Sequence, residues 1–393
     1  MTTSPSVSVI PITLFFVVIC SNINLKGEEI SRQSGWDINA LVFEGYNSNV
    51  EATSSPTGSF YTEIDLELGR VFSTPRLLIE AELEGGLDFY YSRQLNRNLY
   101  PEAGGNFSLS YEISPRTSLT FDTSGQFLSQ PSFTSPGSYQ DQGDYFFLSG
   151  GTSIEHRWRP RISTITSWDA NFYLYADPYY QDSLGRVEQI FGNQTLFLWK
   201  PTTSLVQEYR LNPRTYFQDS SMDSLGQYFL LGANQKLNPR SEVLGRFGVE
   251  QRWTGSGNGG NGHYLGPYGE IALSYTAARN NIDLIATYGT QSSGLVGVGE
   301  SDTFQLSGEV SRNLGKKTKV AISGGYQLNR FSQTTASGGF ENDVVNLGVG
   351  IERKIGNRVS LEAGYRYSGV VSDGGNDGTY NRNIIYLGTK IDL

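Results

Sequence analysis

Acidic residues recur at every second position in two neighbouring stretches of the sequence. In 61–69 and 77–89 they alternate with apolar residues, so that Glu63 is followed by Ile64 and Glu82 by Leu83. This alternation is typical of a β-strand with two different faces, because successive side chains point to opposite sides. The acidic face consists of Glu63, Asp65, Glu67, Glu80, Glu82, Glu84 and Asp88. Carboxylates gathered on one wall of a pore would favour cations and discourage anions.

Later stretches carry charges of both signs at the same spacing. Arg246, Glu250 and Arg252 share one face of a predicted strand, and Glu352 and Arg366 follow on later strands. If these residues line the same space as the acidic residues, a transverse field would run between an acidic and a basic wall. The alternative is that the charges pair with one another and only stiffen a hydrated interior.

Residues suited to acid–base, nucleophilic or metal chemistry are scarce. His156 lies beside a tight turn and His263 in a glycine-rich stretch, and neither has a visible nucleophile or acid partner. Cys20 is the single cysteine, which excludes an internal disulfide and a cysteine metal site. The stretch DGGNDG at 373–378 lacks the ligand spacing of a calcium loop. We therefore predict no enzyme activity, metal or cofactor, and the net charge of −9 gives no basic surface for nucleic acid.

Tight turns interrupt the alternation at nearly even spacing, about 40 residues apart, and each interval holds two strands and one long polar connection. A propeller blade has a similar length but contains four short strands. The turns are predicted near Pro75, Pro115, Pro160, Pro201, Pro239, Asn280, Gly315 and Gly356.

These turns define eight hairpins, and one strand precedes them (36–46) while another follows them (383–393). We therefore predict an all-β fold, a transmembrane up-and-down antiparallel β-barrel of about 18 strands, with short periplasmic turns and long extracellular loops. Sixteen strands is the alternative count. Closure removes the sheet edges that long amphipathic hairpins would expose. A β-sandwich is the alternative fold, but its strands would usually be shorter.

The composition suits strands with one apolar face and one polar face. Charged residues make up 18% of the chain, below the roughly 25% of soluble domains, and aromatic residues make up 13%. The one long apolar run, at 7–20, is too short for a spanning helix and has the length of a signal-peptide core. A lipoprotein processing site at 17–20 is a weaker alternative. We predict a signal peptide at 1–26, a short segment at 27–35 and a single barrel at 36–393, in the outer membrane of a Gram-negative bacterium.

Aromatic residues lie near the predicted strand ends, where a barrel crosses the membrane surface. Trp158 and Trp199 would form a girdle beside the tight turns, and Phe89, Tyr90, Trp253 and Tyr367 a girdle near the long loops. The alternative is that they are core residues of a sandwich. Thirteen of the thirty Lys and Arg residues also lie at or beside the tight turns, where they would meet anionic headgroups or simply be solvated.

Two stretches carry a family resemblance: FEGYNSNV at 43–50 and SFYTEIDLELG at 59–69. They resemble the start of a family of Gram-negative β-barrel porins that accompany exopolysaccharide biosynthesis genes. The resemblance implies an outer-membrane barrel with an Asn-rich first loop. Such barrels commonly end in Phe for recognition by the outer-membrane assembly machinery, whereas this sequence ends in Leu393.

The pattern and the resemblance together predict a porin-like channel for small hydrophilic solutes or for polysaccharide export. Aromatic clusters at 173–180 and 261–268 would stack on sugar rings or anchor the barrel at the interface. The alternative function is a plugged or structural surface barrel whose loops bind a partner. The expected partners are outer-membrane lipids, the assembly machinery and a polysaccharide, and the barrel would be a monomer or a trimer.

Overall fold

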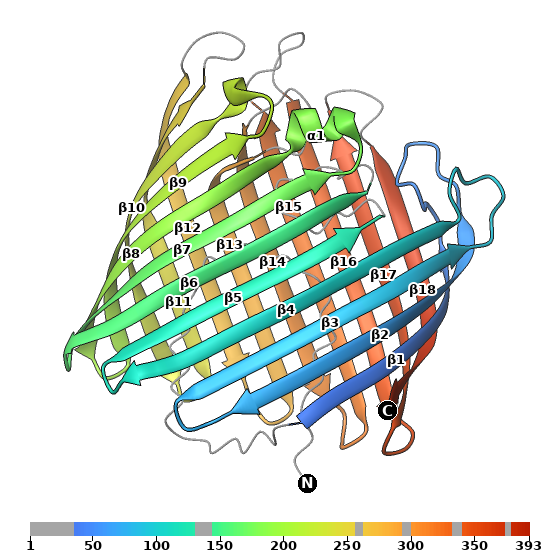
Figure 1. Cartoon of the computed structure of the whole chain (residues 1–393), viewed down its shortest axis with the longest axis horizontal. Coiled ribbons are helices and arrows are strands. Elements are labelled where there is room, and N and C mark those ends of the chain that lie inside the picture. The colour runs from blue at the N-terminus through green and yellow to red at the C-terminus, as the bar shows by residue number, and fades with distance from the viewer. Residues whose placement is uncertain (1–34, 130–143, 256–261, 293–299, 332–339, 374–378) are drawn as a thin grey trace.

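Each strand of the protein pairs antiparallel with its neighbours in the sequence, and β1 pairs with β18 to close the ring (Figure 1). The computed structural model describes residues 35–129, 144–255, 262–292, 300–331, 340–373 and 379–393. Within these residues the 18 strands form one continuous sheet. The predicted fold and strand count are confirmed, and closure of a single sheet excludes the sandwich alternative.

The strands are 12 to 16 residues long. The first nine are β1 (Gly35–Asn47), β2 (Ser59–Ser73), β3 (Leu77–Tyr90), β4 (Leu99–Ser114), β5 (Thr117–Leu128), β6 (Tyr145–Arg159), β7 (Ile162–Tyr175), β8 (Arg186–Lys200) and β9 (Thr203–Tyr216). The others are β10 (Ser224–Asn238), β11 (Ser241–Thr254), β12 (Gly262–Thr276), β13 (Asn280–Ser292), β14 (Glu300–Asn313), β15 (Thr318–Phe331), β16 (Phe340–Lys354), β17 (Val359–Ser372) and β18 (Tyr380–Asp392).

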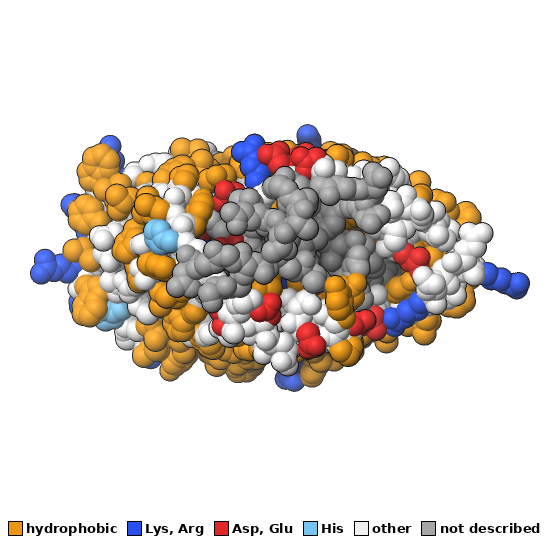
Figure 2. All heavy atoms as spheres, turned by 90° about the horizontal axis from the view of Figure 1, so that it is seen from above, with side chains coloured by type: hydrophobic (Ala, Val, Ile, Leu, Met, Phe, Trp, Pro, Cys, Tyr) orange, Lys and Arg blue, Asp and Glu red, His pale blue; other side chains and the backbone are white. Residues whose placement is uncertain are grey.

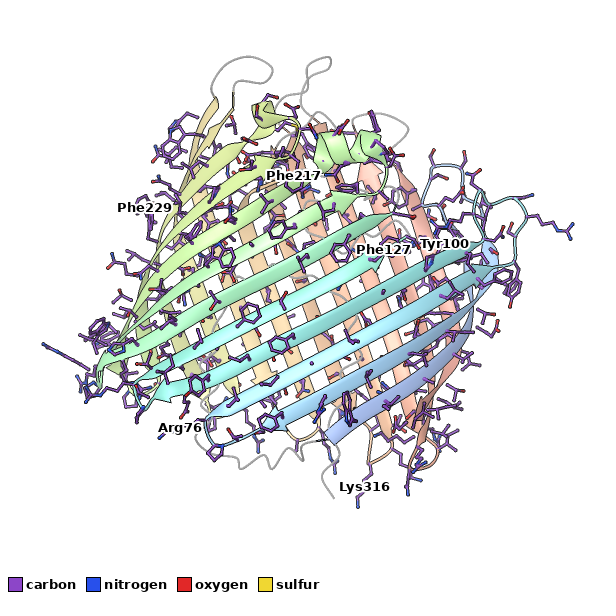
Figure 3. The ribbon with its side chains drawn as sticks, in the orientation of Figure 1. Arg76, Tyr100, Phe127, Phe217, Phe229 and Lys316 are labelled. Atoms are coloured by element: carbon purple, nitrogen blue, oxygen red, sulfur yellow. The ribbon has the colours of Figure 1, made fainter. Side chains whose placement is uncertain are left out.

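The two ends of the barrel differ in the length of their connections. All eight predicted tight turns join consecutive strands at one end, here called the turn end, and Arg76 and Lys316 lie there (Figure 3). The longer connections lie at the opposite end, here called the loop end, and two contain short helices, α1 (Pro178–Leu184) and η1 (Ser220–Met222). Among the described residues, no helix is long enough and apolar enough to cross a membrane.

The outer surface of the barrel is apolar. Each of the 18 strands carries at least one large apolar side chain that is exposed, and the outward-facing Leu231 of β10 is 68% exposed. Figure 2 shows the flattened outline of the barrel from the loop end, with hydrophobic side chains around its perimeter. Soluble monomers rarely expose apolar patches of more than a few hundred Å². An apolar surface around a whole barrel is therefore expected to be covered by lipid.

The division predicted at the start of the chain is not tested. The signal peptide at 1–26 lies outside the described residues, as does nearly all of the segment at 27–35. The first strand of the barrel begins at Gly35, next to the predicted start at residue 36.

Candidate functional site

The acidic face predicted from the sequence points into the barrel. Ile64 and Leu66 of β2 are exposed on the outside, so the residues that alternate with them face inward. The register of β2 and β3 places Glu63 opposite Asp88 and Glu67 opposite Glu84. The inward faces of β2–β4 carry no Lys or Arg. We call the following residues the acidic wall: Glu63, Asp65, Glu67, Glu80, Glu82, Glu84, Asp88 and, from β4, Glu102.

Small neighbours and one cation help this wall to hold like charges side by side, which would otherwise repel across the strands. A Cβ at Gly86 would lie only 2.1 Å from Oδ1 of Asp65, so glycine gives this carboxylate its space. Glu67 forms an ion pair of 2.8 Å with Lys390 of β18. Carboxylate oxygens of Glu63, Asp65 and Glu102 lie within 4.8 Å of one another. Such oxygens can share a cation, but this spacing also follows from three neighbouring acids on one wall.

A second charged cluster lies on the inward faces of β8, β9, β11 and β12 and includes Glu300 from the tip of β14, and we call it the paired wall. It contains five arginines and five glutamates, so its formal charges cancel. Nine of the ten are almost completely buried, and the exception, Glu300, has a side chain that is 14% exposed. The members are Arg186, Glu188, Glu208, Arg210, Arg214, Arg246, Glu250, Arg252, Glu270 and Glu300.

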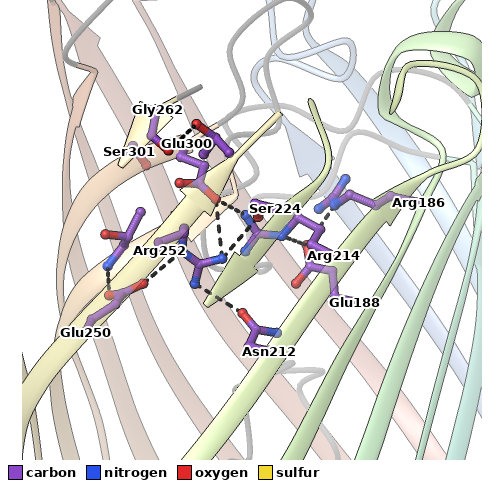
Figure 4. A network of polar contacts seen from close by, with 12 residues as sticks. Arg186, Glu188, Asn212, Arg214, Ser224, Glu250, Arg252, Gly262, Glu300 and Ser301 are labelled. Atoms are coloured by element: carbon purple, nitrogen blue, oxygen red, sulfur yellow. Dashed lines mark hydrogen bonds and ion pairs between the residues drawn. The ribbon is translucent and has the colours of Figure 1, made fainter. Parts of the chain in front are cut away.

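Four of the ion pairs of the paired wall connect strands that are not neighbours, and two of these are drawn in Figure 4. Glu300 at the start of β14 lies 3.0 Å from Arg214 of β9 and 3.3 Å from Arg252 of β11. Arg210 of β9 pairs with Glu270 of β12 at 3.4 Å. Side chains that reach across several strands must cross the interior, so this part of the flattened barrel is filled by the pairs themselves.

A proline in β9 explains part of this arrangement. Pro213 has no N–H to donate, and the pairing between β8 and β9 is interrupted between Glu188–Arg214 and Phe191–Leu211. The side-chain amide of Asn212 instead donates to the carbonyl of Gln189 at 2.7 Å. The Oδ1 atom of Asn212 in turn accepts from Nη2 of Arg252 at 3.1 Å. The side chain of Asn212 thus supplies a hydrogen bond between β8 and β9 where their backbone pairing is interrupted, and it also positions Arg252 of the paired wall.

The remaining predicted lumen residues also face inward. Glu352 of β16 lies opposite Glu362 of β17, on the side away from the exposed Ile351. Arg366 packs over the ring of the inward-facing Tyr386, 4.9 Å from its centroid. Arg366, Glu84 and Asn106 are exposed although they point inward, so the interior contains space that reaches these three side chains. Arg246, Glu250 and Arg252, in contrast, are buried within the paired wall.

The first long connection, at 48–58, folds into the mouth of the barrel. Val50 packs against the inward-facing Tyr61 of β2 and Tyr90 of β3, and Ala52 packs against Val344 of β16 and Val370 of β17, on the other side of the β1–β18 pair. Ala52 has a φ of 50°, a strained value that a residue other than glycine keeps only when its surroundings fix it.

Two asparagines hold this first loop in place, Asn49 within it and Asn47 at the end of β1. The Nδ2 atom of Asn49 donates to the carbonyl oxygens of Thr53 at 2.7 Å and Asn381 at 3.1 Å, and Asn47 donates to the hydroxyl of Tyr90 at 3.3 Å. Both asparagines are almost completely buried.

Most of the predicted girdle aromatics lie on the outer face. Trp158 and Trp199 are about equally exposed beside the tight turns, and Phe89 and Trp253 are exposed toward the loop end. Tyr367 shares the outer face of β17 with the exposed Tyr365 and is half-buried. Tyr90 corrects the prediction, because it points inward and is 2% exposed. It is two residues from Asp88, and alternation places both side chains on the same face.

Neither histidine belongs to a catalytic arrangement among the described residues. His156 Nδ1 lies 2.9 Å from the hydroxyl of Thr117, and His263 Nε2 lies 2.9 Å from the side-chain amide of Gln251. Most of the stretch at 373–378 lies outside the described residues.

Sequence reasoning missed seven of the ten members of the paired wall. The signal was present, because Glu208, Arg210, Asn212 and Arg214 occupy alternate positions in 208–214. This signal was overlooked because Pro213 lies within the stretch, and a proline, which cannot donate a backbone hydrogen bond, is unusual in a strand that is paired on both sides. The pairing of these residues with Glu270 and Glu300 depends on which strands meet across the flattened interior, which the sequence does not state.

No protein-family model and no curated protein sequence matches this chain. Solved structures with a similar fold include the outer membrane protein OpdK from Pseudomonas aeruginosa, with 10% identity, 91% of this chain and 99% of that chain covered, and a TM-score of 0.48. A BenF-like porin from Pseudomonas fluorescens has 11% identity, coverage of 92% and 99%, and a TM-score of 0.48. OccAB3 from Acinetobacter baumannii has 8% identity, coverage of 91% and 99%, and a TM-score of 0.46. The exopolysaccharide-associated family is not among these similarities.

Proposed function

We propose that this protein is an outer-membrane channel for small hydrophilic solutes and that its lumen favours cations. The observation that carries the proposal is the acidic wall, which lies inside a closed barrel with an apolar exterior. A polar interior and an apolar outer band are the features of barrels that span an outer membrane.

The membrane location is supported by strand length and surface chemistry. Strands of 12 to 16 residues exceed the 9 to 11 residues that suffice to cross a bilayer when tilted. A closed barrel satisfies its backbone hydrogen bonds between strands, as the hydrocarbon region requires. The basic residues at the turn end would then lie at the periplasmic surface.

The cation preference is supported by the way the charges are distributed. The paired wall is neutral, so it contributes little to a transverse field across the lumen. The acidic wall has eight carboxylates and no Lys or Arg on the inward faces of its own strands, and Glu84 is exposed within the lumen. A pore lined in this way attracts cations and repels anions.

The test has two stages. Heat-modifiable migration of the purified protein in detergent gels first establishes whether a closed barrel is present. Reconstitution into planar bilayers with a salt gradient then measures conductance and reversal potential. We expect discrete channels whose reversal potential has the sign of cation preference. A folded barrel that gives no channels in repeated reconstitutions would contradict the proposal.

A plugged barrel whose loops bind a partner is the second candidate function. It is favoured by the first loop, which packs Val50 and Ala52 inside the mouth. The same conductance experiment separates the two functions, because a plugged barrel would fold and show heat-modifiable migration but would give no channel current.

Polysaccharide export is a narrower form of the channel proposal and rests on the resemblance of residues 43–69. In the cluster at 173–180, Tyr173 and Tyr175 point inward and are buried among other aromatic side chains, whereas Tyr179 of α1 is 62% exposed and is the ring available to stack on a sugar. Block of the channel current by added oligosaccharides would favour this narrower proposal.

A further inference from the structure

At the loop end, the tips of β13 and β14 separate from β12 and turn into the interior of the barrel. β12 and β13 pair only from Gly269–Tyr288 to Thr276–Asn281, whereas β13 and β14 stay paired as far as Ser292–Glu300. Residues 262–268 of β12 therefore pair with β11 alone. Pro267 lies in this stretch, which is not paired with β13. Proline has no backbone N–H and so cannot donate a hydrogen bond to β13.

Three contacts place these tips against the inner faces of β11 and β12. The backbone N–H of Thr290 donates to Oε2 of Glu250 at 2.9 Å. A Cβ at Gly289 would lie 2.6 Å from the ring of Tyr268, so glycine lets the β13 backbone rest on this ring. The hydroxyl of Tyr264, on the inward face of β12, lies beside Asp302 of β14. Since Thr303 is the residue that faces inward, the outer side of β14 here lies against the inner side of β12.

Glu300 connects these tips to the paired wall. Its Oε1 atom lies 3.0 Å from Nη1 of Arg214 and 3.3 Å from Nη1 of Arg252, so one carboxylate joins two arginines on two other strands (Figure 4). Both arginines are almost completely buried, and each has one further glutamate partner, Glu188 for Arg214 and Glu250 for Arg252. Loss of the Glu300 charge would leave the two buried arginines short of a counter-charge.

We infer that the inturned tips of β13 and β14, residues 289–292 and 300–303, form a constriction of the lumen that Glu300 holds in place. This inference rests on the proposed channel function. The tips lie inside the ring that the other strands form, and so they occupy cross-section that a regular barrel would leave open. Without the Glu300 charge they can move back toward the unpaired part of β12, which widens the passage.

The test compares Glu300→Gln with Glu309→Gln. Glu309 lies on the same strand and faces inward, but it is nearer the turn end and outside the paired wall. We expect Glu300→Gln to raise single-channel conductance by roughly twofold and Glu309→Gln to leave it near the original value. Heat-modifiable migration verifies that both variants form barrels. If Glu300→Gln does not fold, Arg214→Gln removes one of the two ion pairs and is expected to raise conductance in the same direction.

A second readout does not depend on conductance. Ser301 is 3% exposed beside Glu300. In a Cys20→Ser background, Ser301→Cys gives a single thiol, whose modification by a small water-soluble reagent reports opening of the tips. Addition of Glu300→Gln is expected to accelerate labelling on the order of tenfold.

Each outcome decides the inference. Unchanged labelling and unchanged conductance in Glu300→Gln would overturn it. Faster labelling with unchanged conductance would mean that Glu300 holds the tips but that they are not a constriction, which also overturns it. If the original protein does not conduct, the proposed channel function fails, and the constriction inference fails with it, while labelling still reports whether Glu300 holds the tips.

Discussion

Glu250 and Arg252 lie on the same face of β11, joined by an ion pair of 2.9 Å, and both side chains are completely buried. Arg252→Ala would leave Glu250 and Glu300 without this partner in the interior. We expect a loss of about 3–5 kcal/mol in the free energy of unfolding, the usual cost of breaking a buried pair. Equilibrium unfolding in urea with lipid vesicles measures this loss.

The control is the exposed ion pair between Arg330 and Glu341, whose side chains are 61% and 49% exposed. Arg330→Ala removes the same charge but is expected to cost at most about 1 kcal/mol. Equal losses in the two variants would mean that the paired wall contributes no more than a surface pair does.

Neutralising part of the acidic wall is expected to weaken the cation preference. In Glu80→Gln/Glu82→Gln/Glu84→Gln, three inward carboxylates of one strand lose their charge. The cation-to-anion permeability ratio should fall by roughly a factor of two or more. The reversal potential under a salt gradient checks this expectation.

The matched control neutralises three exposed acids toward the loop end, as Glu44→Gln/Asp182→Asn/Glu341→Gln. It changes the net charge equally and should leave the permeability ratio near its original value. An unchanged ratio in the acidic-wall variant would remove these residues from ion selection.

Two adjacent residues in the middle of β16 distinguish lipid from water. Leu347 faces outward and is 52% exposed, whereas Asn346 faces inward. Leu347→Arg would place a charge in the hydrocarbon region and is expected to cost about 2–4 kcal/mol, whereas Asn346→Arg should cost much less. Unfolding in vesicles measures both, and a reversed order would show that the apolar surface does not face lipid.

Removal of the Asn49 side chain is expected to loosen the first loop. Asn49→Ala loses the hydrogen bonds to Thr53 and Asn381 and should destabilise the loop by about 1–3 kcal/mol. Limited proteolysis within 48–58 should accelerate, while Ser55→Ala, at an exposed position of the same loop, should leave the rate unchanged. Equal proteolysis of the two variants would mean that Asn49 does not hold the loop.

The fold could be predicted because tight turns and period-two alternation are local signals. Proline turns separate the hairpins, and the alternation around Ile64 and Leu83 specifies which face meets lipid. The alternation also predicts the direction of Tyr90. If Asp88 points inward, Phe89 must point outward and Tyr90 inward. The prediction for Tyr90 gave more weight to its aromatic ring than to its position.

The paired wall could not be predicted in the same way. Whether Arg252 faces open water or a buried glutamate depends on the flattening of the ring and on the inturned tips of β13 and β14. The first loop is a similar case. Asn47 and Asn49 are ordinary loop residues in the sequence, and only the meeting of β1 with β18 brings Asn381 within reach of Asn49.

The pairing of β1 with β18 is required to close the barrel. Asn39 pairs with Asp392 and Asn47 with Ile384, so the ring closes through contacts that span nearly the whole sequence. Without these contacts, β1 and β18 would each present unpaired backbone N–H and C=O groups with which other chains could pair. Removal of β18 would therefore not give a smaller barrel. It would give an open sheet with two exposed edge strands, β1 and β17, which could pair with other chains.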